Sequence, residues 1–305
     1  MPNRLASAKR SAHLPFVFVT AAHAKLNLSL AITGRRADGF HELVSLVAGL
    51  ELADELTFTP GPAFALTCDD PTLPVDGTNL VLRAAEAYAR RRPACVRGAF
   101  RLAKRIPHGA GLGGGSSDAA AALRLLDQAV PDPLGLAELE VLAAEIGSDC
   151  PYFIRGGLQV MRGRGERLSP VSASVRQALA GQRVLVIKPP FGVATPEAYA
   201  GFARLGRYQD SVIAEARLAA WCAAPAGDPG ELGNDLAAVI FAKHLALPTA
   251  LDWLQSRHGL CFRLTGSGSA CFALGAGDGD VAPIMGTLRS AWGSAAWLAD
   301  TRISV

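Results

Sequence analysis

The clearest pattern of hydrophobic and polar positions lies near the N-terminus, in the segment FVFVTAAHAKLNLSLAI at residues 16–32. From Ala22 onward apolar and polar residues alternate: the apolar ones are Ala24, Leu26, Leu28 and Leu30, and the polar ones are His23, Lys25, Asn27 and Ser29. Because successive side chains of a strand point to opposite faces, this alternation predicts a strand with one buried face. The turn residues of GRRADGF follow, and residues 42–60 predict one or two further strands.

Helical spacing appears in three segments of the first half of the chain. Residues 78–92, TNLVLRAAEAYARRR, predict an amphipathic helix capped by Thr78 or Asn79. After a short predicted strand at 98–106, residues 116–130 have the composition of a helix, capped by Ser116 or Ser117. Residues 136–151 predict a third helix that ends at a glycine and leaves a turn displaying Ser148 and Asp149.

The second half of the chain mixes the same kinds of element. RVLVIKPPFGVATPEAY at 183–199 predicts a buried strand, a loop and the start of a helix, and CFRLTGSGSACFALG at 261–275 predicts a β-hairpin. Strands and helices follow one another without a regular strand-helix repeat, which favours the α+β class over a doubly wound sheet. With 305 residues, the chain is expected to form two domains, at 1–165 and 166–305.

Composition narrows the class of protein. A net charge of +3 is too small to indicate a nucleic-acid-binding surface, and no run reaches the roughly 20 apolar residues that span a bilayer. The six cysteines have neither metal-ligand nor disulfide-framework spacing, so buried, reduced thiols are expected. The first 24 residues imitate a secretory signal, but cleavage there would strand Lys25 at a new terminus. We therefore expect a cytoplasmic protein in which residues 1–15 are a disordered tail.

The stretch PHGAGLGGGSSDAAAA at 107–122 runs glycines directly into a predicted helix. Main-chain N–H groups and the positive end of the helix dipole then converge, which suits a phosphate. A P-loop is excluded because no lysine follows the glycines. Gly109, Gly111 and Gly114 satisfy the dinucleotide pattern G-x-G-x-x-G, but Asp127, the acidic residue downstream, lies within a predicted helix. A flexible surface loop before a helix is the simplest alternative.

A third kind of loop fits better. PHGAGLGGGSSDAA resembles the ATP loop of the GHMP kinases, the family of galactokinase and of homoserine, mevalonate and phosphomevalonate kinases. AKLNLSLAITGRRADGFHEL, GSDCPYF and LTGSGSACFAL match further motifs of that family in the family's order, between residues 22 and 275. The resemblance is strongest to the members that phosphorylate a CDP-linked methylerythritol on the non-mevalonate route to isoprenoids. It implies a ribosomal-S5-like N-terminal domain and a ferredoxin-like C-terminal domain.

The resemblance also implies which residues hold ATP and its Mg²⁺. Lys104 is expected to touch adenine or an ATP phosphate, although an exposed strand-end lysine is an equal alternative. Ser117 is expected to touch the metal ion, whereas helix capping would explain either serine of the loop equally well. The expected nucleotide-binding residues are Lys104, Pro107, Gly109, Ala110, Gly111, Leu112, Gly113, Gly114, Gly115, Ser116, Ser117, Gly266, Ser267 and Gly268.

By the same resemblance Lys25 and Asp149 are the catalytic pair, although a strand lysine is usually solvated and such an aspartate is usually a turn residue. A lysine beside the carboxylate would keep it ionised to accept the hydroxyl proton, and would neutralise the transferring phosphoryl group. The other residues expected to bind the substrate are Asn27, Phe40, His41, Thr195 and Tyr199. Phe40 and Tyr199 would stack on cytosine, His41 would bond its edge, and Thr195 would hold the diphosphate.

Three other functions compete with this one. Another GHMP kinase would keep the ATP loop but has no use for the aromatic DGFHEL segment at 38–43. A non-catalytic nucleotide-binding module would not need both Lys25 and Asp149, and an NAD-dependent oxidoreductase needs the acidic residue that the dinucleotide pattern lacks. The expected partner is a small molecule, with no nucleic acid or membrane, and the chain is expected to be a monomer or a weak homodimer.

Overall fold

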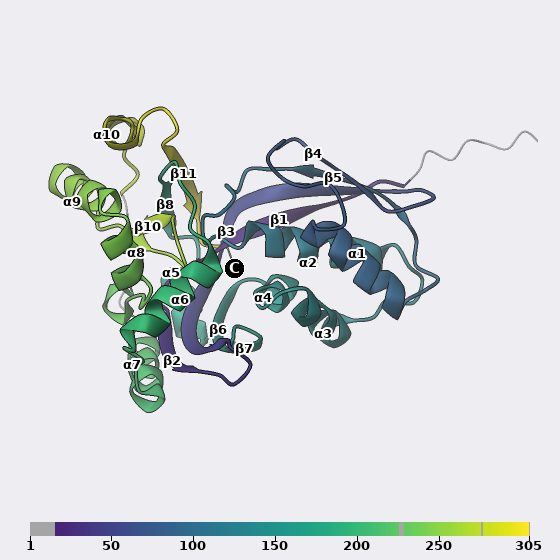
Figure 1. The fold of residues 1–305 in the computed structure, drawn as a ribbon, viewed down its shortest axis with the longest axis horizontal. Coiled ribbons are helices and arrows are strands. Elements are labelled where there is room, and N and C mark those ends of the chain that lie inside the picture. Colours follow the sequence, from purple (N-terminus) through teal and green to yellow (C-terminus); the bar gives the residue numbers. More distant parts are fainter. Residues whose placement is uncertain (1–15, 226–228, 276, 305) are drawn as a thin grey trace, which may run out of the picture.

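A computed structural model describes residues 16–225, 229–275 and 277–304. These residues form two β-sheets, each with its own set of helices (Figure 1). The mixed order of strands and helices confirms the α+β class. The predicted tail at residues 1–15 lies outside the described residues.

The larger sheet has seven strands and is organised around one of them. Strand β3 is 20 residues long, and it pairs with β1, β2, β5 and β6. A parallel pairing of β4 with β5 and an antiparallel pairing of β6 with β7 complete the sheet. The strands are β1 Phe18–Asn27, β2 Ala31–Arg35, β3 His41–Pro60, β4 Ala65–Cys68, β5 Gly98–Ala103, β6 Leu158–Gly163 and β7 Arg167–Pro170.

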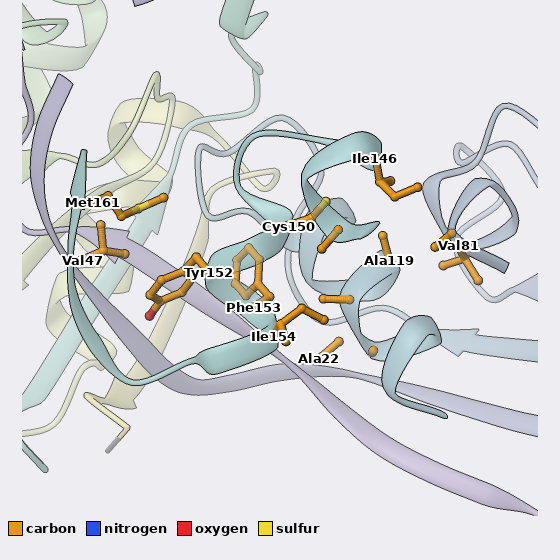
Figure 2. Close-up of a cluster of buried hydrophobic side chains, with 14 of the residues drawn as sticks. Ala22, Val47, Val81, Ala119, Ile146, Cys150, Tyr152, Phe153, Ile154 and Met161 are labelled. Carbon is orange, nitrogen blue, oxygen red and sulfur yellow. The ribbon is translucent and has the colours of Figure 1, made fainter. Parts of the chain in front are cut away.

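Four helices cover one face of this sheet and are grouped together in Figure 1. They are α1 Leu80–Arg91, α2 Gly114–Gln128, α3 Leu136–Ile146 and α4 Cys150–Arg155. Helix α2 is central, packing against β1, α1 and α4, and its alanines at 119–122 are fully buried. Figure 2 shows side chains of this core from β1, β3, α1, α2, α3, α4 and β6. Small alanine side chains let α2 approach both the sheet and its neighbouring helices.

The second sheet has four antiparallel strands in the order β11-β8-β10-β9. Its strands are β8 Arg183–Lys188, β9 Arg263–Leu264, β10 Cys271–Leu274 and β11 Trp297–Arg302. The predicted hairpin at 261–275 is confirmed by the pairing of β9 with β10. The helices of this half are α5 Ala173–Leu179, α6 Thr195–Leu205, α7 Ser211–Ala223, the 3₁₀ turn η1 Gly230–Leu232, α8 Ala237–Lys243, α9 Ala246–His258 and α10 Ala282–Trp292.

The division between the two halves is best placed after the predicted residue 165. Strand β7, at 167–170, still pairs with β6 in the larger sheet, whereas β8 starts the second sheet at Arg183. We therefore propose that the domains meet in the segment 171–182. Within the described residues no single helix is long and apolar enough to cross a membrane. Helices α8 and α9 together have the length and composition of a span, but they are bent by 104° where they meet.

The prediction that the strand around Lys25 has only one buried face is wrong. Strand β1 ends at Asn27, and both faces of its last residues are covered: Lys25 is 5% and Asn27 6% exposed. The reason lies in tertiary packing, because the glycine loop and helix α2 lie over the face that the alternation marks as solvated. A polar face that is buried in this way requires hydrogen-bond partners or a ligand.

Two smaller predictions are also corrected. Neither Ser116 nor Ser117 caps helix α2, because the helix begins earlier, at Gly114, after Gly113 in the left-handed conformation. The expectation of buried cysteines holds only for Cys150 and Cys271, since Cys261 is exposed and the other three are partly exposed. The cap at Asn79 is confirmed: its side chain accepts a hydrogen bond from the Val81 amide.

Candidate active site

A cavity of about 970 Å³ lies where the two halves of the chain meet. The glycine loop and the ends of β1, α2 and α4 line it from the first half, and the start of α6 and the turn at 266–267 line it from the second. Small-molecule sites commonly occupy such interdomain hollows.

Glycines in the loop are required by close packing on both sides. Gly113 has a φ of +75°, and a Cβ placed there would lie 2.5 Å from the Phe153 ring and 3.1 Å from Lys25 Cγ. Gly111 has a φ of +76°, and a Cβ there would lie 2.7 Å from the carbonyl oxygen of Thr265. The loop is therefore squeezed between helix α4 and β1 on one side and the β9–β10 turn on the other.

Main-chain hydrogen bonds fix the loop in this position. The amide of Lys25 donates to the carbonyl of Leu112 at 3.0 Å, and the amide of Ala270 donates to that of Ala110 at 3.0 Å. One bond comes from the first half of the chain and the other from the second. The loop thus holds the two halves together, with the unpaired first-turn amides of α2 following directly after it.

Those amides give the cavity the chemistry of a phosphate site. No acidic residue occupies the hydrogen-bonding positions of the first turn of α2, and no side chain caps it. Unsatisfied N–H groups at a helix N-terminus attract anions through both hydrogen bonds and the helix dipole. Gly113, Gly114, Gly115 and Ser116 all line the cavity at this point.

A lysine and an aspartate meet beside the loop. Lys25 Nζ lies 3.4 Å from Asp149 Oδ2 and donates to Asn27 Oδ1 at 2.5 Å. Lys25 comes from β1, and Asp149 comes from the turn between α3 and α4, where its side chain is 37% exposed and makes no capping bond. The carboxylate is therefore available to a ligand while the ammonium group is held in place.

Aromatic side chains gather at another part of the cavity wall. Tyr199 lies 5.1 Å from the His41 ring, centroid to centroid, and Phe40 is exposed. His41 is buried, and its Nε2 has no hydrogen-bond partner among the described residues. Burial, together with the charge of Arg35, lowers the pKa of His41, which favours the neutral form of the ring. Phenylalanine is usually the more buried of these two residue types, and here the order is reversed.

Lys104 is buried in an ion cluster and is not an exposed strand-end residue. Its Nζ lies 2.5 Å from Asp54 Oδ2 and 2.8 Å from Asp118 Oδ2. Burial alone would lower the pKa of Lys104, but the charges of Asp118 and Asp54 outweigh it and raise that pKa. Burial raises the pKa of Asp118 to about 7, against the opposing charge of Lys104. Asp54 also accepts the amides of Arg105 and Ile106, which ties the cluster to the start of the loop.

The structure brings almost all of the predicted site residues to the same cavity. Those lining it are Lys25, Asn27, Phe40, His41, Lys104, Pro107, Gly109, Ala110, Gly111, Leu112, Gly113, Gly114, Gly115, Ser116, Asp149, Thr195, Tyr199, Gly266 and Ser267. Ser117 and Gly268 do not line it. Ser117 is 1% exposed because it points into the packed side of α2, and the Gly268 amide is used within its own turn by a bond to the carbonyl of Thr265.

Sequence reasoning missed some of the lining. Asp118 follows the two serines of the loop, so its place in the motif could have marked it, but its pairing with Lys104 and Asp54 depends on the fold. Arg164 and Gly165 lie in the β6–β7 turn, 139 and 140 positions from Lys25 in the sequence, and no local pattern distinguishes them.

Comparison with known proteins defines the class. The protein-family model named GHMP kinases N terminal domain matches residues 79–157. The family model named GHMP kinases C terminal matches residues 219–293. The two matches fall on the two halves described above. The mevalonate kinase of Methanococcus jannaschii has the same fold, with a TM-score of 0.66 at 13% identity over 97% of this chain and all of that one. The chain is an ATP-dependent kinase of the GHMP class.

More similar relatives narrow the class. A protein of Synechococcus sp. (strain CC9605) is 41% identical over 85% of this chain and 87% of its own, and one of Polaromonas sp. (strain JS666) is 37% identical over 93% of each. Both are named 4-diphosphocytidyl-2-C-methyl-D-erythritol kinase. A solved structure of 4-(cytidine 5'-diphospho)-2C-methyl-D-erythritol kinase has a TM-score of 0.70 and 33% identity, covering 93% of this chain and 99% of that one. The chain belongs to this family of GHMP kinases.

The packing around Gly113 predicts that even the smallest side chain is harmful there. Gly113→Ala should lower the free energy of unfolding by about 2–5 kcal/mol, the sum of left-handed backbone strain and the overlap with Phe153, and should raise the KM for ATP. The matched control is Gly135→Ala, because Gly135 also has a positive φ, +81°, but nothing lies within 4 Å of its Cβ position. Urea unfolding of both variants checks this, and equal losses would show that the loop is not tightly packed.

The cluster around Lys104 predicts a pH-dependent stability term. The pKa of Asp118 is raised from 3.8 to about 7, so between those pH values the folded chain holds a proton that the unfolded chain has lost. Stability from this group is therefore complete below about pH 4 and is lost as the pH rises towards 7. Asp118→Asn should remove this term, so the variant should gain stability relative to the parent chain from pH 4 to pH 7. Unfolding curves at several pH values measure it, and a difference that stays constant would contradict it.

Proposed function

We propose that the chain transfers the γ-phosphoryl group of ATP to the 2-hydroxyl of 4-diphosphocytidyl-2-C-methyl-D-erythritol. The observation that carries the proposal is the juxtaposition, in one cavity, of a phosphate-binding loop, a lysine-aspartate pair and a buried histidine with a free ring nitrogen. Such a reaction serves the non-mevalonate route to isoprenoid precursors.

Phosphoryl transfer needs positioning and charge neutralisation more than covalent chemistry. In the proposed arrangement the amides of the glycine loop and of the first turn of α2 hold the triphosphate. Lys25, fixed by Asn27, then faces the terminal phosphoryl group and offsets the charge that builds on it. The Asp149 carboxylate, 3.4 Å away, orients the substrate hydroxyl and accepts its proton late in the transfer.

The aromatic end of the cavity fits the cytidine part of the substrate. A neutral His41 offers its unpaired Nε2 to a hydrogen-bonding edge of the base, and Tyr199 and Phe40 offer ring faces. Thr195 Oγ1 lies 2.9 Å from Ser267 Oγ, so a pair of hydroxyls from the second half of the chain is placed to bind phosphate oxygens. Neither homoserine nor mevalonate carries a heterocycle that would use the aromatic part of this wall.

Mg²⁺ fits this site as an ion carried by ATP. The described residues contain no group of three or more His, Cys, Asp or Glu side chains that could hold a metal, and the buried Ser117 is unsuited to the role expected of it. Mg²⁺ in kinases typically keeps several waters and takes only one or two protein oxygens besides phosphates. Ser116 lines the cavity at the first turn of α2 and would supply one such oxygen. When bound, the ion neutralises phosphate charge.

We place the reaction in the cytoplasm, where ATP is available. We also propose that the chain acts as a monomer or a weak homodimer.

The substrate itself can be tested directly. ATP consumption measured against CDP-linked methylerythritol, mevalonate and homoserine should show turnover of the first alone at comparable concentrations. Preference for mevalonate or homoserine would assign the chain to a different GHMP activity. ATP binding with no turnover of any of the three would instead favour a nucleotide-binding module.

The role of Asp149 predicts a specific defect. Asp149→Asn keeps the shape of the side chain but cannot accept a proton, so kcat should fall by about 10²–10⁴ while the KM for ATP stays nearly unchanged. The control is Asp132→Asn, whose side chain is 85% exposed and makes a surface ion pair with Arg92. Steady-state kinetics of the two variants suffice, and an Asp149→Asn enzyme with normal kcat would remove Asp149 from the mechanism.

A further inference from the structure

Arg164 is a cationic residue of the cavity that has no role in the proposed phosphoryl transfer. Arg164, in the turn between β6 and β7, lines the cavity, and its guanidinium carbon lies 5.0 Å from the centre of the Phe40 ring. Among the described residues its guanidinium donates one hydrogen bond, to the carbonyl of Ala144, which is 3.5 Å long and therefore weak. The side chain is held mainly by the aromatic face.

The surroundings of Gly165 show that Arg164 lies between the places proposed for the cytidine and the polyol of the substrate. A Cβ placed at Gly165 would lie 3.5 Å from Asp149 Oδ1 and 3.4 Å from the carbonyl oxygen of Ser148. The turn therefore has its backbone beside the catalytic carboxylate and its guanidinium beside the aromatic ring. A molecule that reaches from Asp149 to Phe40 passes this turn.

The two lysines that line the cavity already have partners within the protein. Lys25 is bonded to Asn27 and lies beside Asp149, and Lys104 is enclosed by Asp54 and Asp118. The arginine at position 35 sits opposite His41 in the β2–β3 pairing, at the aromatic end. Arg164 is thus the cation best placed over the middle of the path.

Resting on the proposed function, we infer that Arg164 is a specificity-determining residue that binds the diphosphate linking the cytidine and polyol parts of the substrate. A guanidinium presents a planar fork of donors that matches two phosphate oxygens at once, and it is always charged. The aromatic face of Phe40 pre-orients that fork, because a guanidinium stacked on a ring keeps its N–H edges free. Nearby, the Asp38 carboxylate is paired with Arg36 at 3.0 Å, and the charge of Arg164 is a smaller contribution that also lowers the pKa of Asp38.

The test compares Arg164→Met, which keeps an unbranched, flexible side chain but removes the charged guanidinium, with the parent enzyme. The KM for CDP-linked methylerythritol should rise by about 10- to 100-fold, as expected for a lost charged hydrogen-bond pair, with kcat changed less than about 3-fold. The KM for ATP should be unchanged. Arg164→Lys, which keeps the charge but not the fork, should recover part of the loss.

Inhibition by free CDP and by cytidine separates a diphosphate contact from a brace for Phe40. In the parent enzyme CDP should inhibit more strongly than cytidine, and Arg164→Met should remove that preference while leaving cytidine inhibition unchanged. Equal weakening of both inhibitors would mean that Arg164 acts through the Phe40 ring, which would overturn the inference. An unchanged KM for the substrate would overturn it as well.

The matched control is Arg167→Met, from the next strand, whose side chain is 64% exposed and pairs with Glu42 outside the cavity. It should leave both KM values unchanged. Thermal unfolding of each variant excludes loss through misfolding. If the parent enzyme does not phosphorylate CDP-linked methylerythritol at all, the proposed function fails, whereas a working parent with an indifferent Arg164→Met variant refutes only the role of Arg164.

Discussion

The site depends on how closely the glycine loop passes between its neighbours. Gly113 leaves no room for a Cβ against Phe153 and Lys25, and Gly111 leaves none against the β9–β10 turn. Hydrogen bonds from Lys25 and Ala270 fix the loop to both halves of the chain. The same close approach that holds the halves together directs the start of α2 into the cavity. The architecture and the proposed phosphate site therefore have one physical cause.

The charged side chains around this loop differ in exposure: the carboxylate of Asp149 is partly exposed, whereas the two lysines are buried. The exposed side of Asp149 faces the cavity, whereas Lys25 is held at 6% side-chain exposure by Asn27. Lys104, equally buried, is balanced by two carboxylates and serves to tie β3 and α2 to the start of the loop. Two lysines with similarly buried side chains therefore differ in their partners: Lys25 lies beside the cavity-facing Asp149, and Lys104 is enclosed by two carboxylates.

The sequence alone predicts much of this. Helix ends at Asn79 and Gly147, the hairpin at 261–275 and the turn displaying Asp149 all follow from local patterns, because caps and turns depend on neighbouring residues. What it could not predict depends on residues far apart in the chain. The alternation around Lys25 suggests a solvated face because the covering loop lies about 85 residues away. The exposed Phe40 and the ion cluster at Lys104 have the same explanation.

The central claim is that the loop amides deliver a triphosphate to an alcohol held between Lys25 and Asp149. A crystal structure with a non-hydrolysable ATP analogue and CDP-linked methylerythritol tests it most directly. We expect the terminal phosphate within hydrogen-bond distance of Lys25 Nζ, and the 2-hydroxyl of the substrate within the same distance of the Asp149 carboxylate. A triphosphate bound away from the first turn of α2, or a hydroxyl remote from Asp149, would contradict the account.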